Sequence, residues 1–510
     1  MKPLTNALIL LAGLGLGYRP ASCHGHKMVY DFDHIKPSTN LNWKPCFNDF
    51  NCSRLQVPLD YSNKSLGTTS IAFLKLAGAN ATAKSPSIVL IPGGPGNSGV
   101  DLLLSSAVMA KQMFGEEYNI VSFDPRGVNN SGPSLDCFSD NSEARSAFQR
   151  LHNTGITNVS TTSLEEQYYS SSIYGEWCNH AVKTKFPHGY YVTTPAVARD
   201  LLTFVEAESK LAGQKSSDAK LWAYGISYGT VIGTTFASMF PDRVGRMVLD
   251  GIVDAELYYR NAYTANVDQA DEAMDKFSAL CHSAGSEKCS FWGPTAKNIT
   301  ARLDNLIRHL QNRPVPISGA QTRSLPAMVT YSDLKALFLT ALYTPVAMFP
   351  VMAEVLHQVE NGNVTALVGM FESTIIPTDA NHVIQCSDAS RTNSITTLQE
   401  FKSYVEHTTR KSKYIGDIYP IYVDSVPTSY PILFTSNTID PITPLRSAQE
   451  SSSRFPGSVL LLQEAIGHTV VNQGASICYV EHIRAYYQGV IPSSKITCPK
   501  QYTPFLNSPF

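Results

Sequence analysis

The sequence predicts an α/β fold in which a mostly parallel central sheet is covered by helices on both faces. Short, continuously apolar runs occur at residues 87–91, 119–123, 221–224, 246–249, 431–435 and 459–462. Helical patterns lie between many of them. Buried parallel strands are apolar on both faces instead of alternating with polar residues, and strand–helix alternation is typical of α/β proteins.

A long interruption of this alternation indicates the domain organisation. The alternation stops after about residue 253 and resumes near residue 429. The intervening sequence has helical patterns at residues 267–281, 297–311, 332–342 and 348–360. We therefore expect four parts: a signal peptide at 1–23, a first core part at 24–252, a largely helical cap over the active-site face at 253–428, and a second core part at 429–510.

The composition gives no reason to expect a membrane or a nucleic acid as partner. The 510 residues carry a formal net charge of −2, which implies no strongly basic surface. An uncharged stretch at 336–353 is interrupted by Pro345 and Pro350, and we expect buried helices there instead of a membrane span. His-Glu-x-x-His, paired Cys-x-x-Cys, EF-hand and Walker motifs do not occur, so we expect neither a metal nor a cofactor.

The N-terminus and the cysteines indicate an oxidising compartment. Lys2 and the apolar run at 7–17 have the form of a secretory signal that is too short to span a bilayer, and small residues near 21–23 suit cleavage. If Cys23 leaves with the signal, nine cysteines remain and at least one is unpaired within the chain. The sequence does not fix the connectivity, but pairing of nearest neighbours gives Cys46–Cys52, Cys137–Cys178, Cys281–Cys289 and Cys478–Cys498. Cys386 is then left over, and we interpret it as a buried, inert thiol.

Asn-x-Ser/Thr sequons are numerous in the chain. Seven of them begin at Asn51, Asn63, Asn80, Asn129, Asn158, Asn298 and Asn363. This number is typical of a eukaryotic secreted glycoprotein, so we expect N-linked glycans at these positions.

The pentapeptide Gly225-Ile226-Ser227-Tyr228-Gly229 is the most informative motif. It follows the apolar run at 221–224 and precedes a helical pattern at 230–240. Strand, Gly-x-Ser-x-Gly and helix together form the layout of a nucleophile elbow. The serine of such an elbow sits on a tight turn, and the glycines avoid side chains that would collide there. Ser227 is therefore predicted to be a nucleophile.

A serine nucleophile needs a base and an acid that orients the base, and in this layout both follow the serine in the chain. His468 follows Gly467 and the run at 459–462, which places it on a loop at the C-terminal end of a strand. Asp440 leaves the preceding strand, with room for one helix and one strand before His468. Asp250, at the end of the strand after the nucleophile helix, is the alternative acid; otherwise it is a turn-forming residue.

The reaction also needs donors for a negative oxygen. One donor is expected to be the backbone N–H of Tyr228, and the others are expected on the loop that carries Gly93 and Gly94, because bare glycine backbone approaches an oxygen closely. The same loop matches G-x-G-x-x-G at 94–99. This pattern is typical of dinucleotide-binding loops. We reject a dinucleotide site here because Pro95 removes a backbone donor from the phosphate cradle and because such a site leaves the nucleophile motif unexplained.

Together these motifs resemble the secreted tripeptidyl-aminopeptidase-like branch of the prolyl-aminopeptidase family, whose members are α/β-hydrolases. Residues 92–96 are similar to the family's oxyanion loop, with proline where many members have histidine, and residues 123–127 are similar to its Asp-x-Arg-Gly turn. Residues 440–444 resemble the acid loop and residues 467–469 the base loop. The resemblance implies an α/β-hydrolase fold and a catalytic triad of Ser227, Asp440 and His468.

Three functions compete at this point. The first is a secreted serine exopeptidase that acts on free peptide N-termini, as the resemblance implies. The second is an esterase or amidase that acts on a small metabolite, and the third is a non-enzymatic binding protein, against which an intact triad argues. An exopeptidase needs acids that capture the substrate's ammonium group; the candidates are Glu176, Asp254, Glu256 and Asp388, each of which is by default an ordinary surface acid.

Overall fold

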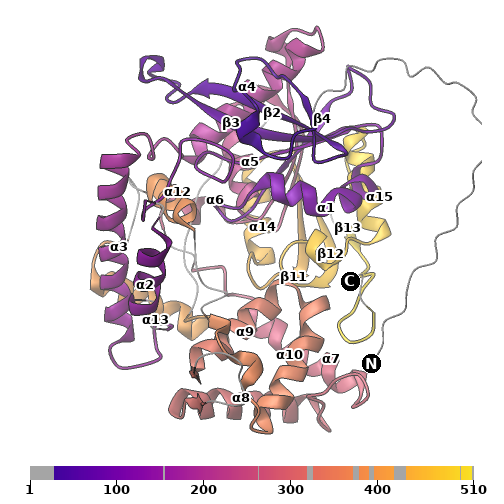
Figure 1. The fold of residues 1–510 in the computed structure, drawn as a ribbon. Helices are drawn as coiled ribbons and strands as arrows, with labels where there is room; N and C mark the ends of the chain where they lie inside the picture. Colours follow the sequence, from indigo (N-terminus) through magenta and orange to yellow (C-terminus); the bar gives the residue numbers. More distant parts are fainter. Residues whose placement is uncertain are drawn as a thin grey trace, which may run out of the picture.

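The structure is a computed structural model, and it describes residues 28–139, 141–152, 155–261, 264–318, 326–371, 378–389, 395–417, 432–493 and 496–507. The predicted signal peptide at 1–23 lies outside these residues. Figure 1 shows a central sheet with helices on both faces and further helices gathered at one end of it.

A ten-stranded sheet forms the centre of the fold. Its order is β1 (Lys44–Cys46), β2 (Phe50–Pro58), β3 (Thr68–Leu76), β5 (Asn119–Phe123), β4 (Ser87–Ile91), β6 (Leu221–Ile226), β7 (Val244–Asp250), β11 (Leu433–Ile439), β12 (Val459–Ile466) and β13 (Ile496–Cys498). The strands from β5 to β13 are parallel, and β1 to β3 add an antiparallel edge. The six apolar runs of the sequence correspond to the central strands, which confirms the predicted fold class; the first residue of one run, Pro431, lies outside the described residues.

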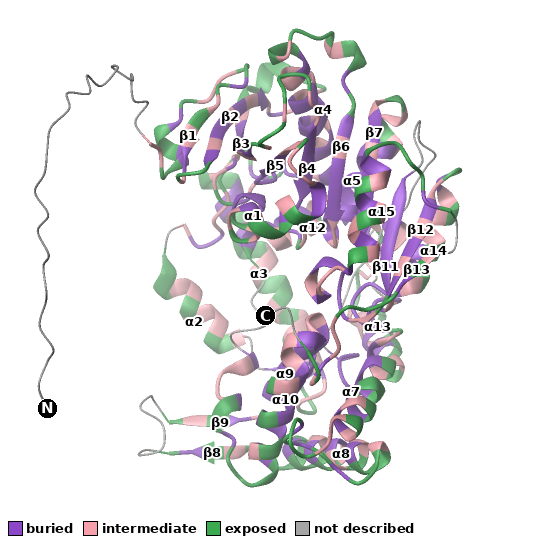
Figure 2. Cartoon of the chain, turned by 90° about the vertical axis from the view of Figure 1, so that its right-hand side faces the viewer, coloured by how far each residue is buried: buried purple, intermediate pink, exposed green. Residues whose placement is uncertain are grey.

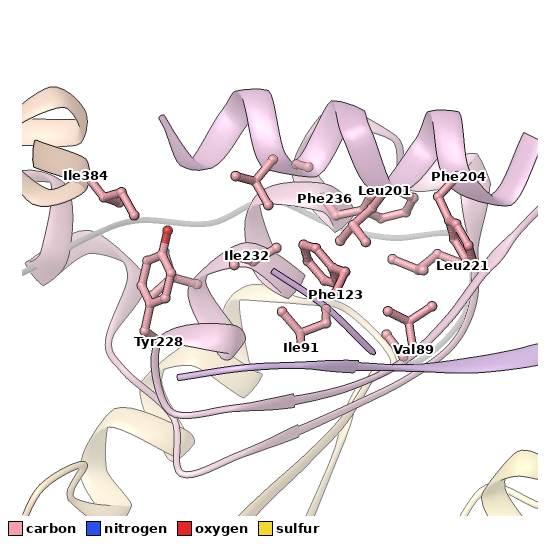
Figure 3. Close-up of a cluster of buried hydrophobic side chains, with 14 of the residues drawn as sticks. Val89, Ile91, Phe123, Leu201, Phe204, Leu221, Tyr228, Ile232, Phe236 and Ile384 are labelled. Atoms are coloured by element: carbon pink, nitrogen blue, oxygen red, sulfur yellow. The ribbon is translucent and has the colours of Figure 1, made fainter. Parts of the chain in front are cut away.

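Each face of the sheet has its own apolar core. Val89 and Ile91 of β4 pack on the face covered by α4 (Thr194–Leu211) and α5 (Tyr228–Met239), as Figure 3 shows. The alternate residues Ile88 and Leu90 pack on the other face, against α1 (Gly99–Phe114) and α15 (Ile477–Tyr487). Because both faces of the central strands are largely buried, most residues of these strands are apolar, and the strands are largely purple in Figure 2.

A helical segment lies between β7 and β11. It contains α6 (Ala255–Tyr259), α7 (Ala270–Ala284), α8 (Ala296–Asn312), α9 (Tyr331–Tyr343), α10 (Pro345–Glu360), α12 (Asp379–Ala389) and α13 (Leu398–Lys411), with a small hairpin of β8 (Val315–Ile317) and β9 (Ala327–Val329). The uncharged stretch at 336–353 belongs to α9 and α10, whose apolar side chains are largely buried in a core of their own. Within the described part of the chain, no helix has the length and apolar character that crossing a membrane requires.

Two helices between β5 and α4 also lie away from the two faces of the sheet, near the helical segment. These are α2 (Ser142–His152) and α3 (Ser163–Lys185), which follow β5 in the chain. In space α3 packs against α13, so helices from both sides of the nucleophile motif meet on one side of the molecule (Figure 1). The sequence did not indicate this arrangement.

The predicted disulfides and sequons fall on described residues. The structure contains the disulfides Cys46–Cys52, Cys137–Cys178, Cys281–Cys289 and Cys478–Cys498, as predicted. Cys386 is free, but it is exposed, so the expectation of a buried thiol was wrong. Five sequon asparagines are exposed, namely Asn63, Asn80, Asn129, Asn298 and Asn363, whereas Asn51 and Asn158 are half-buried. Glycosylation stays a prediction.

Candidate active site

Ser227 lies on a tight turn between β6 and α5. Its backbone has φ 54° and ψ −123°, a conformation that a residue with a side chain rarely adopts. The Ser227 N–H donates to the carbonyl of Asp250, 2.9 Å away, which ties the turn to the end of β7. A Cβ atom added to Gly229 would lie 2.3 Å from the carbonyl oxygen of Ile91, so the second glycine of the motif is a steric necessity.

Asp440 and His468 lie side by side at the ends of β11 and β12. The Nδ1 atom of His468 is 3.3 Å from each carboxylate oxygen of Asp440. Both side chains are almost fully buried, with 0% and 3% of the residue exposed, respectively. The structure therefore brings together the acid and the base that the sequence predicted.

The Asp440 carboxylate has several further donors. The backbone N–H groups of Ile442, Thr443 and Thr469 donate to it over 2.8–3.0 Å. The Thr443 hydroxyl also donates to Asp440 Oδ2 over 2.8 Å, and its oxygen is 3.1 Å from His468 Nδ1. This hydroxyl is thus closer to the ring nitrogen than either carboxylate oxygen is. Thr443 was not among the predicted site residues; its only signal in the sequence is its place three residues after the acid.

The loop that carries His468 is held from several sides. The amide of Asn437 donates to the carbonyls of Gly467 and Thr469, and the amide of Gln473 donates to the carbonyl of His468. From the helical segment, the carbonyl of Tyr343 accepts the His468 N–H, and the two rings meet edge to face. The backbone on both sides of the histidine is therefore fixed.

Asp250, the alternative acid, has a different role. Its buried carboxylate accepts the N–H groups of Val470 and Val471, over 2.9 and 3.2 Å, and the hydroxyl of Tyr224 over 2.9 Å. Burial raises the pKa of Asp250 to about 6. Asp250 is thus a buried support of the loop after His468, and it is neither the partner of the imidazole nor a simple turn residue.

Ser227 and His468 both lie against the end of β7. A Cβ atom added to Gly251, the residue after Asp250, would lie 3.3 Å from Cε1 of His468. Among the described residues, the Ser227 hydroxyl and the His468 ring share no hydrogen bond. The hydrogen bond between a catalytic serine and its histidine is often long before a substrate is bound. Because Nδ1 of His468 faces Asp440, Nε2 is the ring nitrogen that is left to act on the serine.

The glycine loop after β4 lies next to the nucleophile. A Cβ atom added to Gly93 would lie 3.2 Å from Cβ and 3.7 Å from Oγ of Ser227. Gly94 has φ +110°, a conformation that favours glycine. From the helical segment, the Asn381 side chain of α12 donates to the carbonyl of Pro95 over 2.8 Å, so α12 lies over this loop.

The Asp-x-Arg-Gly turn supports the same loop. Asp124 accepts the hydroxyl of Ser98 and the N–H of Val100, the residues that begin α1 directly after the glycine loop. Arg126 is buried and forms a bidentate pair with Asp200 over 2.6 and 2.8 Å. Through these contacts the turn is a scaffold beside the site.

The four acids considered for ammonium binding have different surroundings. Glu176 is exposed on α3. Asp254 caps α6 and pairs with Arg454, and Glu256 also pairs with Arg454. Asp388 lies in the wall of a large cavity, so its interpretation as a surface acid was wrong.

A histidine also lies close to two cysteines in the described residues. Cys478, His482 and Cys498 have potential ligand atoms within 4.8 Å of one another. The two sulfurs are joined in a disulfide, so they offer no thiolate to a metal.

Comparisons with known proteins agree with this geometry. A model of the alpha/beta hydrolase fold family matches residues 86–471. Serine protease Hip1 of Mycobacterium tuberculosis is 28% identical over 476 residues, which cover 88% of this chain and 87% of that protein. Tripeptidyl aminopeptidase of Streptomyces coelicolor is 26% identical over 500 residues, which cover 91% and 87%. Carboxylesterase B of Mycobacterium tuberculosis is 23% identical over 477 residues, which cover 88% and 86%.

Proposed function

This chain belongs to the alpha/beta hydrolase fold family, and on that premise we propose that it is a secreted serine hydrolase which releases residues or short peptides from free N-termini. The observation that carries the proposal is the 3.3 Å contact between His468 Nδ1 and Asp440 beside the elbow of Ser227. The relatives named serine protease and tripeptidyl aminopeptidase support a peptide as the substrate.

The proposed mechanism proceeds through an acyl-enzyme. His468 removes the proton of the Ser227 hydroxyl while the serine oxygen attacks the substrate carbonyl carbon. Asp440 stays ionised, holds the ring in the tautomer with a proton on Nδ1, and stabilises the imidazolium. Nε2 of the ring then gives the proton that it took from the serine to the leaving amine as the C–N bond breaks. This step leaves the acyl group as an ester on the serine. His468 then deprotonates a water molecule, whose oxygen attacks the ester carbonyl carbon; the bond to the serine oxygen breaks, and the imidazolium returns the proton to that oxygen.

The negative oxygen of each tetrahedral intermediate needs donors at the elbow. We assign this role to the backbone N–H of Tyr228 and to the loop of Gly93 and Gly94, which lies against Ser227. Each donor of this type lowers the barrier by about 3 kcal/mol. Since any side chain at position 93 would occupy space beside the serine oxygen, glycine suits this position.

The proposal includes the location and the organisation of the enzyme. Four disulfides suit an oxidising compartment, and the sequons suit a glycosylated, secreted chain. The helices between β7 and β11 act as the cap, because Tyr343 contacts His468 and Asn381 contacts the glycine loop.

A second candidate is an esterase or amidase that acts on a small metabolite. The relative named carboxylesterase B favours it. The Ser-His-Asp arrangement performs ester and amide cleavage by the same steps, so the triad itself does not separate the two functions.

A panel of substrates separates these two functions. The panel contains chromogenic tripeptides with a free N-terminus, the same peptides with an acetylated N-terminus, and aryl acetates. An exopeptidase cleaves the free peptides and loses this activity on acetylation, whereas a metabolite esterase cleaves only the small esters. Ser227→Ala should abolish every activity and leave the thermal unfolding midpoint in place; activity that survives this change contradicts the proposal.

A further inference from the structure

A cavity of about 1310 Å³ lies between segments that come from both sides of the nucleophile motif in the chain. Its walls come from α2, α3, α12 and α13, and none of Ser227, Asp440 and His468 lines it. The cavity exceeds the range of about 300–1,000 Å³ that is usual for small-molecule sites. Most of its large side chains are aromatic, and they include Phe138, Phe148, Tyr174, Tyr259, Phe401 and Tyr404.

Asp388 is the acid of this cavity that has no cationic partner among the described residues. Its carboxylate accepts the N–H and the hydroxyl of Thr194, over 2.8 and 2.6 Å, and the hydroxyl of Tyr258 over 2.8 Å. All three donors are neutral. Burial raises the pKa of Asp388 to about 7. A cation bound to Asp388 would offset the free-energy cost of burying the ionised carboxylate.

The other two acids of the cavity wall are already neutralised. Asp379 pairs with Arg145, and Asp417 pairs with the buried ammonium group of Lys335 over 2.9 Å. Besides Arg145, the wall contains the ammonium group of Lys183, an exposed residue of α3, and the imidazoles of His152 and His382. Asp388 is thus the acid in the wall whose charge no described cation balances, so a positive group of a ligand gains an ionic partner there.

Short contacts connect Asp388 to the nucleophile. The Thr194 hydroxyl that donates to Asp388 lies 2.6 Å from the hydroxyl of Tyr228, the residue after Ser227. One tyrosine side chain and two hydrogen bonds therefore separate the elbow from the carboxylate. Moreover, α12 carries Asp388 near one end and, near the other, Asn381, which contacts the glycine loop.

We propose that this cavity binds the N-terminal segment of a peptide with bulky apolar side chains, and that Asp388 pairs with its free ammonium group. The aromatic walls take the side chains, and the ammonium donates to the carboxylate that the neutral donors hold in place. The inference rests on the proposed exopeptidase function and adds to it the location and the chemical class of the bound segment.

The first test compares Asp388→Asn with wild type and with Glu176→Gln, a matched control at an exposed acid outside the cavity wall. The assay measures kcat/KM for a phenylalanine-rich chromogenic tripeptide with a free N-terminus and for its acetylated form. The ratio of the two should fall about tenfold or more in Asp388→Asn, because a charged hydrogen-bond partner is lost, and should stay at the wild-type value in Glu176→Gln. A ratio within about twofold of wild type in Asp388→Asn would overturn the inference.

Turnover of an aryl acetate, which has no ammonium group, separates this inference from the proposed function. If wild type hydrolyses neither the acetate nor any peptide, the proposed function has failed. If wild type is active and the ratio does not respond to Asp388→Asn, the inference has failed.

A second measurement does not depend on the folding of Asp388→Asn. Cys386 is exposed and lines the cavity, so it reports occupancy. In the Ser227→Ala protein, which cannot consume substrate, the rate of alkylation of Cys386 by N-phenylmaleimide is followed by mass spectrometry. A saturating free tripeptide should slow this alkylation and the acetylated tripeptide should protect much less; no protection, or equal protection by both, would contradict the assignment.

Discussion

The hydroxyl of Thr443 should be necessary for a fully active base. It donates to Asp440 over 2.8 Å and lies 3.1 Å from His468 Nδ1, whereas the carboxylate oxygens are 3.3 Å from that nitrogen. Thr443→Val removes the hydroxyl and keeps the shape of the side chain. A hydrogen bond to a charged group contributes about 1.5–3 kcal/mol, which corresponds to about a 10- to 100-fold fall in kcat/KM if the loss acts on the transition state.

The assay is hydrolysis of an aryl acetate, with Thr443→Ser as the matched control because it keeps the hydroxyl. We expect the fall to appear in kcat with KM nearly constant, since Thr443 is predicted to act on the base and not on the substrate. The pH profile of kcat/KM should change in Thr443→Val and stay close to wild type in Thr443→Ser. Wild-type activity of Thr443→Val, or an equal loss in Thr443→Ser, would refute the reasoning.

Two further predictions concern the glycine loop and Asp250. Gly93→Ala should lower kcat/KM by about 100-fold or more while the unfolding free energy changes little, because the new methyl group lies beside the serine oxygen and disturbs the donors of the oxyanion; equal activity in an ester assay would contradict this role. Burial raises the pKa of Asp250 from its ordinary value of 3.8 to about 6, so between these values the folded chain binds more protons than the unfolded chain. The unfolding free energy of wild type should therefore fall, on the order of 3 kcal/mol, as pH rises through this window, and this component should be absent from Asp250→Asn. Urea unfolding of wild type and Asp250→Asn at about pH 4 and about pH 7 measures this component. If the unfolding free energies of the two proteins change equally with pH, the prediction is wrong.

The parts of the fold that the sequence predicted have strong local signals. The central strands are buried on both faces, so residues such as Ile88 and Val89 are apolar in succession. Ser227, Asp440 and His468 each follow such a strand, and in a parallel sheet the ends of these strands lie at one edge. Strand order and loop position were therefore enough to select all three candidates.

The parts that the sequence did not predict depend on packing between distant segments. The helix α3 has 23 residues but buries only Ser163, Cys178, Ala181 and Val182, so its apolar pattern is weak. Asp388 looked like a surface acid because its donors, Thr194 and Tyr258, come from segments more than one hundred residues away. Cys386 was expected to be buried, but it faces a cavity whose walls come from both sides of the nucleophile motif.

The central claim is that Ser227, Asp440 and His468 act as one catalytic group. A fluorophosphonate probe reacts with a serine only when a neighbouring base activates it. Mass spectrometry after labelling should find one probe per chain, attached to Ser227, and labelling should be nearly lost in His468→Ala and strongly slowed in Asp440→Asn. An unlabelled Ser227, a probe on another residue, or undiminished labelling of His468→Ala would contradict the claim.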